Sequence, residues 1–151
     1  MIKDHENLIK GRIAETIVEE MFRDAGYQVY RFGYESFLQS LVQKDNRINK
    51  RNIVGKMVSS MPDFLVVKNN KPDFIEVKFR KDGKLDKEEL ESWSKARVLL
   101  VSPSQPFFQI SSVTAFIETG KLYKLDEDNF LSIKKEIIDR YIPLIKKYLG
   151  N

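Results

Sequence analysis

The stretch that decides the fold covers residues 61–81 and reads MPDFLVVKNNKPDFIEVKFRK. It holds the tripeptide Pro-Asp-Phe twice, each time before a short apolar run, and Asn69-Asn70 separates the two runs. Asparagine tolerates the left-handed backbone that a tight hairpin turn needs. The pattern therefore predicts two antiparallel strands, over residues 64–68 and 74–79, joined at this asparagine pair.

Strand geometry decides which aspartate lies beside the charged residues of the second strand. Successive side chains point to opposite faces, so Glu76 and Lys78 share a face, whereas Asp73 points away or lies in the turn. A two-residue turn sets Asp63 opposite Glu76, and a four-residue loop sets it opposite Lys78. Both registers bring Asp63, Glu76 and Lys78 within about 4.5–8 Å of one another. We interpret Asp63 as the aspartate of the functional site and Asp73 as a residue of the turn.

The three charged residues suggest a metal site. Two carboxylates this close raise each other's pKa unless a positive charge lies between them. A hard divalent cation with oxygen ligands meets that need better than Lys78 alone. Such a site can generate a nucleophilic hydroxide and stabilise a phosphoryl transition state. The alternative is a partly exposed salt bridge worth under about 1 kcal/mol, but the apolar residues on every side favour the metal site.

Periodicity and stop signals predict the remaining elements. Helices are expected over residues 6–25, 34–43, 85–96, 111–119 and about 130–149, the last with a kink or break near Pro143, and strands over 27–32, 98–102, 107–110 and 122–125. The two apolar runs of the hairpin lack alternation, so helices should cover both faces of the sheet. The predicted fold class is α/β, with a central mixed β-sheet flanked by helices. No linker divides the 151 residues, which we take as a single domain.

Composition limits the chemistry and the partners. The chain has no Cys and a single His, which excludes disulfides and thiolate metal sites and disfavours a Ser-His-Asp triad. The lack of Cys agrees with a reducing, cytoplasmic location, and no apolar run reaches the length of a membrane span. A net charge of +4 and a pI near 9.2 favour a polyanionic partner.

The motif resembles that of a known family. Pro62-Asp63, twelve intervening residues and then Glu76-Val77-Lys78 are similar to the signature of the PD-(D/E)XK nucleases, the restriction-endonuclease-like phosphodiesterases. The family's order of helix, three strands, helix and strand resembles the order expected over residues 6–102. The pattern is nearest to archaeal Holliday-junction resolvases and related small endonucleases, whereas the insertion 34–60 and the C-terminal extension 103–151 have no counterpart in it. The resemblance implies metal-dependent hydrolysis of DNA phosphodiesters, with branched or structured DNA as a candidate substrate.

The resemblance also implies a role for each matched residue. Asp63 and Glu76 would bind Mg2+, with Mn2+ as a substitute, and the backbone carbonyl of Val77 would be a further ligand. Lys78 would be the catalytic lysine. Glu15, within the GRIAE segment of the first helix, would contact the metal or a water bound to it.

Further residues are candidates for contacts with nucleic acid. Arg80 shares the face of Lys78 and would hold a substrate phosphate, unless it is an ordinary exposed arginine. Four loop cations would either follow a DNA backbone or solubilise the loop: Arg47, Lys50, Arg51 and Lys56. Glu19 is a rival to Glu15, because it lies nearby around the first helix.

The apolar residues leave one question of assembly open. Trp93 and Phe107-Phe108 are expected in the core, and packing is the expected role of Tyr27, Tyr30 and Tyr34. The stripe along the last helix either covers the core or forms a homodimer surface: Ile133, Ile137, Tyr141, Leu144, Ile145 and Tyr148.

Two other functions remain open from sequence. A non-catalytic nucleic-acid-binding protein of the same fold is disfavoured by the intact trio. An RNA-directed nuclease would have the same hydrolytic site, so the sequence does not distinguish it from a DNA nuclease.

Overall fold

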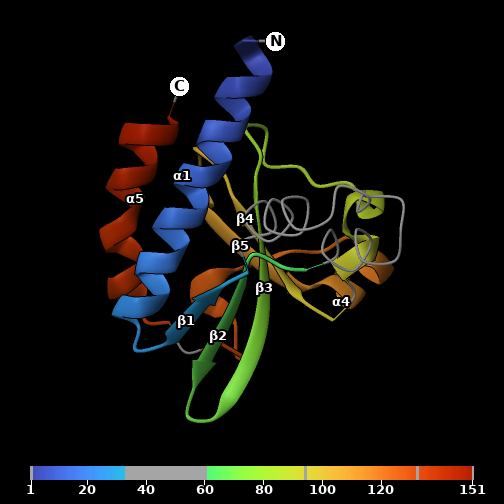
Figure 1. The fold of residues 1–151 in the computed structure, drawn as a ribbon, viewed down its shortest axis with the longest axis vertical. Helices are drawn as coiled ribbons and strands as arrows, with labels where there is room; N and C mark the ends of the chain where they lie inside the picture. The colour runs from blue at the N-terminus through green and yellow to red at the C-terminus, as the bar shows by residue number, and fades with distance from the viewer. Residues whose placement is uncertain (1, 33–60, 94, 132, 151) are drawn as a thin grey trace, which may run out of the picture.

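The computed structural model describes residues 2–32, 61–93, 95–131 and 133–150. These residues form a six-stranded mixed sheet flanked by helices, which confirms the predicted α/β class (Figure 1). The elements are α1 (Ile2–Asp24), β1 (Gln28–Arg31), β2 (Phe64–Lys68), β3 (Lys71–Phe79), the 3-10 helix η1 (Lys87–Trp93), β4 (Arg97–Val101), β5 (Phe108–Ser112), α4 (Val113–Thr119), β6 (Tyr123–Lys124), the 3-10 helix η2 (Leu125–Glu127) and α5 (Lys135–Leu149). The helix expected over 34–43 lies outside the described residues.

The strands follow one another across the sheet in chain order, β1-β2-β3-β4-β5-β6. Among the described strands, β3 and β4 pair in parallel and the other neighbours pair antiparallel. A parallel pair needs a crossover, and the segment that contains η1 makes it. The first residue of β2, Phe64, pairs with Ile75, so the last residues of β3 continue past the N-terminal end of β2. This overhang of β3 is where the candidate site lies.

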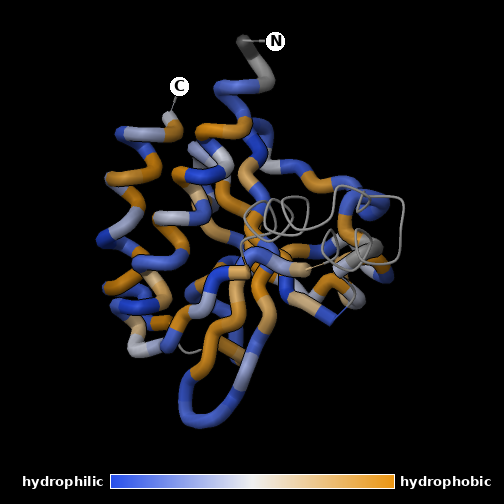
Figure 2. Tube along the Cα trace, in the orientation of Figure 1, coloured by the Kyte–Doolittle hydropathy of each residue, from blue (hydrophilic) through white to orange (hydrophobic). Residues whose placement is uncertain are grey.

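Apolar layers cover both faces of the sheet, as the sequence predicts. Neighbouring residues of β4 show the division, because Leu99 packs in the cluster beneath α1 and α5 whereas Val98 packs in the cluster beneath η1 and α4. Figure 2 shows hydrophobic residues concentrated along the central strands and hydrophilic ones at the tip of the β2–β3 hairpin. No helix in the described ranges has both the length and the apolar character needed to cross a membrane.

The β2–β3 hairpin has the two-residue turn. Asn69 and Asn70 have φ angles of 53° and 63°, the left-handed values that a type I′ turn requires at both central positions. Lys68 pairs with Lys71, and the same register continued by one residue beyond Phe64 sets Asp63 opposite Glu76. The shorter of the two turns considered from sequence is therefore confirmed.

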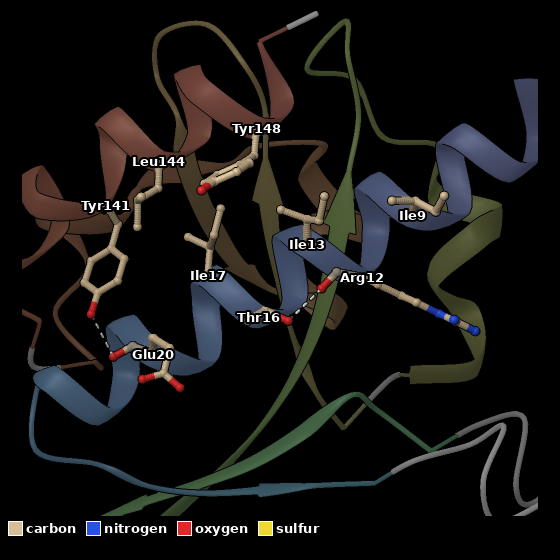
Figure 3. Close-up of a pocket in the computed structure, with 9 residues that line it drawn as sticks. All are labelled: Ile9, Arg12, Ile13, Thr16, Ile17, Glu20, Tyr141, Leu144 and Tyr148. Atoms are coloured by element: carbon tan, nitrogen blue, oxygen red, sulfur yellow. Dashed lines mark hydrogen bonds between the residues drawn. The ribbon is translucent and has the colours of Figure 1, made fainter.

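Polar contacts join α1 to its neighbours. The Lys68 ammonium donates to the carbonyl of Ala25 at 2.7 Å, just past the end of α1. From α5, the Tyr141 hydroxyl donates to the carbonyl of Glu20 at 3.2 Å (Figure 3). The same hydroxyl also hydrogen-bonds the Asp24 carboxylate. Burial and these acidic neighbours raise the pKa of Tyr141 to about 12, so the hydroxyl stays a donor over the whole physiological range.

The helix predicted over residues 85–96 is wrong in type and length. Among the described residues of this range, Lys87–Trp93 are helical, and they form a 3-10 helix. The amide of Ala96 donates to the carbonyl of Trp93 at 2.8 Å, which closes a tight turn directly before β4. The chain must enter β4 at Arg97, opposite Ile75, and this requirement overrides the helical pattern.

The final helix begins later than predicted, at Lys135 instead of about 130. The preceding segment is anchored by the Leu131 amide, which donates to Asp128 Oδ2 at 2.8 Å. Leu131 and Ile133 are both buried although they lie before α5, so apolar residues that pack on the core extend the hydrophobic pattern beyond the start of the helix.

Of the two alternatives predicted at Pro143, a kink or a break, the break is wrong. Pro143 lies inside α5, which is continuous over Lys135–Leu149. A proline inside a helix removes one backbone hydrogen bond. Tyr141 and Ile145 are buried on either side of it, so packing in the core shared with α1 holds the helix together.

Candidate active site

The site begins just before the first residue of β2, beside the last residues of β3. In the register of the hairpin, Pro62 would face Val77 as a hydrogen-bonded pair, but proline has no N–H to complete that pair. The Val77 amide instead donates to Asp63 Oδ2 at 2.7 Å, and the Asp63 carbonyl accepts from the Phe32 amide at 3.0 Å. Asp63 is thus fixed through its backbone on the β1 side and through its carboxylate on the β3 side.

The same geometry orients the Val77 carbonyl. The amide and carbonyl of one strand residue point to the same side of the strand, so this carbonyl also faces the end of β2. Pro62 offers it no donor. A main-chain oxygen beside the Asp63 carboxylate is the kind of ligand that a hard cation takes.

Glu76 is the buried member of the trio. It is 5% exposed, and its Oε2 lies 3.4 Å from the Lys78 ammonium. Burial and the adjacent negative charge of Asp63 raise the pKa of Glu76 to about 9, with a hydrogen bond to Asp63 adding to the effect and the positive charge of Lys78 opposing it. The predicted convergence of Asp63, Glu76 and Lys78 on one face is confirmed as geometry.

This arrangement fits a divalent cation. A buried carboxyl with a raised pKa beside a second carboxyl holds a proton at neutral pH, and a cation bound between the two would take the place of that proton. The part of the chain that the structure describes contains no group of three or more Asp, Glu, His or Cys that could hold a metal. The candidate ligands in the described residues are the Asp63 and Glu76 carboxyls and the Val77 carbonyl, with Glu15 on the opposite wall of the neighbouring cavity.

A polar cavity of about 650 Å³ opens beside the trio. Its walls come from α1, from the ends of β2 and β3, and from the turn after β3: Glu6, Asn7, Lys10, Gly11, Glu15, Asp63, Val77, Lys78, Phe79, Arg80, Lys81 and Asp82. Glu15 thus faces the same space as Asp63 and Lys78, whereas Glu76 lies behind the wall. The rival Glu19 is engaged elsewhere, with its carboxylate 2.8 Å from Arg23 and 3.1 Å from Arg31.

Gly11 is an unusual residue for the middle of a helix. A Cβ added at this position would meet no atom within 4 Å, so close packing does not explain the glycine. Glycine inside a helix costs about 1 kcal/mol relative to alanine. Gly11 lies on the cavity wall, where the absence of a side chain leaves the α1 backbone open to the cavity.

Arg80 and Asp73 are both ion-paired within the protein. Arg80 lines the cavity, but its guanidinium contacts Glu89 Oε2 at 2.9 Å and donates to the Phe79 carbonyl at 2.8 Å. Asp73 lies inside β3 and accepts a hydrogen bond from Arg97 Nε at 3.1 Å, so its interpretation as a residue of the turn is wrong. The turn needs only the two asparagines, which leaves Asp73 to the strand.

Other candidates divide between packing and residues outside the described ranges. Tyr27 is buried, with its ring edge-to-face to Phe22 at 5.2 Å, whereas Tyr30 is half exposed. The four loop cations lie outside the described residues, as does Tyr34: Arg47, Lys50, Arg51 and Lys56.

Trp93 is a site neighbour that the sequence did not reveal. It was expected in the core, but it is only partly buried, and its ring centroid lies 4.5 Å from the Lys78 ammonium. Phe107 and Phe108 are buried as expected. No spacing rule connects Trp93 to the motif, because a crossover brings it there.

Comparison with protein-family models, curated proteins and solved structures finds no match for this chain. The class that the fold and site define is an α/β protein with a buried glutamate, a partly exposed aspartate and a lysine at the overhang of its central hairpin. Any function must be inferred from that motif and geometry.

Proposed function

We propose that this protein is a Mg2+-dependent endonuclease that hydrolyses phosphodiester bonds in DNA, with a restriction-endonuclease-like core of the PD-(D/E)XK type. One observation carries the proposal. Asp63 and Glu76 converge with Lys78 at the overhang of β3, beside a polar cavity. An isolated salt bridge would need only one of the two carboxylates.

The donor set assigns a role to each residue. Asp63, Glu76 and the Val77 carbonyl would hold Mg2+ or Mn2+, and Glu15 would contribute from the α1 side of the cavity. When bound, the cation supplies charge stabilisation at the phosphate and lowers the pKa of a water nucleophile. Lys78, held 3.4 Å from Glu76, would neutralise negative charge that develops on the phosphate.

Basic residues near the cavity support a nucleic-acid substrate. Lys10 and Lys81 line it from α1 and from the turn after β3. Lysines at this position can contact phosphates on either side of the scissile bond without reading sequence. Arg80 and the four loop cations would add to this surface; for Arg80 this requires an exchange of Glu89 for phosphate.

We also propose that the protein forms a homodimer through the groove between α1 and α5, whose lining residues are shown in Figure 3. Leu144 and Tyr148, at 36% and 51% exposure, leave apolar surface there, whereas the other members of the predicted stripe mostly cover the core. Arg12 and Glu20 lie at equal distances in sequence from Thr16, so a two-fold axis at Thr16 would set each arginine against the partner's glutamate. Two copies of one site suit cleavage of two strands.

A substrate panel tests the proposed activity. Labelled single strand, duplex, flap, four-way junction and RNA are incubated with Mg2+, Mn2+ or EDTA. We expect metal-dependent cleavage of DNA that is lost in Asp63→Asn and retained in Asp73→Asn. These two aspartates are a matched pair, since each occupies a Pro-Asp-Phe tripeptide and only Asp63 faces the cavity.

The outcomes separate the competing functions. Cleavage that is confined to RNA would move the assignment to an RNA-directed nuclease. Salt-sensitive DNA binding without any metal binding or cleavage would favour the non-catalytic binding protein. Cleavage that survives Asp63→Asn would contradict the site.

A further inference from the structure

We propose that Trp93 is a positioning residue that holds Lys78 and the segment before Asp63 in their relative places. The inference rests on the proposed function of the Asp63–Glu76–Lys78 site. Trp93 contacts neither carboxylate; it acts through two residues that belong to different segments of the chain.

The first contact fixes the main chain before Asp63. The Trp93 indole N–H donates to the Met61 carbonyl at 3.1 Å. Met61 precedes Pro62 and lies outside β2, so the strand ladder does not hold it. The indole therefore anchors the chain two residues before Asp63, and Asp63 itself is fixed by the Val77 amide and by Phe32.

The second contact restrains the lysine. The Lys78 ammonium lies 4.5 Å from the centroid of the Trp93 ring, within the range of a cation–π interaction, for which tryptophan is the best aromatic partner. A lysine side chain carries its charge at the end of a flexible four-carbon stem. With Glu76 at 3.4 Å and the ring at 4.5 Å, the ammonium is held between a carboxylate and an aromatic face.

The element that carries Trp93 is suited to this role. Trp93 ends η1, where the Ala96 amide donates to its carbonyl at 2.8 Å, and its ring packs against the apolar cluster that includes Leu90. Glu89 of the same element pairs with Arg80 at 2.9 Å. η1 thus contacts the overhang of β3 at Lys78 and just beyond it.

A purely structural tryptophan makes a different prediction. If Trp93 only filled space, any large apolar residue would restore function in proportion to the folded fraction. If it positions Lys78 and Met61, the ring face and the N–H are separate requirements. Trp93→Phe keeps an aromatic face and removes the donor, whereas Trp93→Leu removes both.

Steady-state cleavage of the preferred DNA by the full chain with Mg2+ tests this distinction. We expect kcat to fall by about 10- to 100-fold in Trp93→Leu with little change in KM, because small displacements of a catalytic group cost about this much. Trp93→Phe should recover part of the loss. Phe130→Leu is the matched control, since Arg97 lies 4.6 Å from the centroid of that ring and neither residue lines the cavity. Equal kcat in all variants, corrected for folded fraction, would overturn the positioning role.

A spectroscopic measurement separates this inference from the nuclease proposal. Trp93 is the single tryptophan of the chain, so fluorescence excited at a wavelength that tyrosine does not absorb reports on this ring alone. We expect Lys78→Met to change its emission and Asp82→Asn, at the cavity wall, to leave it unchanged. If Lys78→Met leaves the tryptophan emission unchanged, the contact between Lys78 and the Trp93 ring is refuted, whether or not the protein cleaves DNA. If Lys78→Met changes the emission but the wild-type protein cuts no substrate, the contact is upheld, and both the nuclease proposal and the positioning role of Trp93 in it are overturned.

Discussion

Replacing Glu76 with glutamine should stabilise the protein in the absence of metal at mildly alkaline pH. Glu76 is buried beside Asp63, and the folded state holds its proton up to a pKa of about 9, against 4.5 for an ordinary glutamate. Glutamine has nearly the same shape as the protonated acid and does not ionise. The substitution therefore removes the cost of deprotonation while keeping the packing.

The sign and size follow from linkage. Between pH 4.5 and 9 the folded protein retains a proton that the unfolded chain has released, so the free energy of unfolding falls as pH rises through this window. The slope for one group is at most about 1.4 kcal/mol per pH unit. From pH 5 to pH 8 the advantage of Glu76→Gln over wild type should grow by up to about 4 kcal/mol.

Urea unfolding with EDTA at pH 5 and pH 8 measures the effect. Asp73→Asn is the control on the same strand, because its partner Arg97 lies at 3.1 Å and the loss of this pair should lower stability at pH 8. The two substitutions are thus expected to have opposite signs. Mg2+ at 100 times its dissociation constant should stabilise wild type by about 2.7 kcal/mol and leave Glu76→Gln much less affected.

One result would refute the reasoning. If Glu76→Gln is less stable than wild type at pH 8, the ionised Glu76 is stabilised by Lys78, and the pair is a structural salt bridge instead of a metal site without its cation. If Mg2+ does not change the difference in stability between wild type and Glu76→Gln, this result would also count against a metal site.

Other predictions concern the cavity and the groove. Glu15→Gln should lower metal-dependent cleavage at least 10-fold, whereas Glu19→Gln, which faces arginines outside the cavity, should lower stability slightly and leave kcat unchanged. Gly11→Ala should raise the free energy of unfolding by up to about 1 kcal/mol and weaken DNA binding in a titration, because the added methyl group occupies the cavity wall; unchanged affinity would contradict that placement. Leu144→Asp should convert a dimer to a monomer in sedimentation equilibrium, and a wild-type monomer at high concentration would exclude the dimer.

The sequence predicted most of what depends on local rules. The asparagine pair specified the turn, the turn specified the register, and the period of two placed Asp63 with Glu76 and Lys78. The fold class followed from apolar strands that needed cover on both faces. The family assignment, the metal and the substrate remain predictions.

What the sequence did not reveal depends on contacts between distant segments. The crossover from β3 to β4 shortened the expected helix to η1 and placed Trp93 against Lys78. Arg97 on β4 hydrogen-bonds Asp73 on the neighbouring strand β3. The tripeptide around Asp73 is identical to the one around Asp63, so nothing in the sequence indicated this contact. Pattern rules assign each residue to a face, but they do not say which residue of another segment will meet it there.

Pro62 shows how the sequence builds a site from an interrupted strand ladder. A residue with an N–H at position 62 would complete the pair with Val77 and extend β2 by one step. Proline prevents this, and both polar groups of Val77 are left facing the strand end, where the amide binds Asp63 and the carbonyl points to the same place. Pro72 has no such consequence, because it faces Val67 at a non-hydrogen-bonded position of the hairpin, where its missing N–H leaves the ladder intact. The two Pro-Asp-Phe tripeptides thus differ in position: the proline of the first falls at a hydrogen-bonded position of the hairpin, and the proline of the second at a non-hydrogen-bonded one. This difference explains why only the first leads into a cavity.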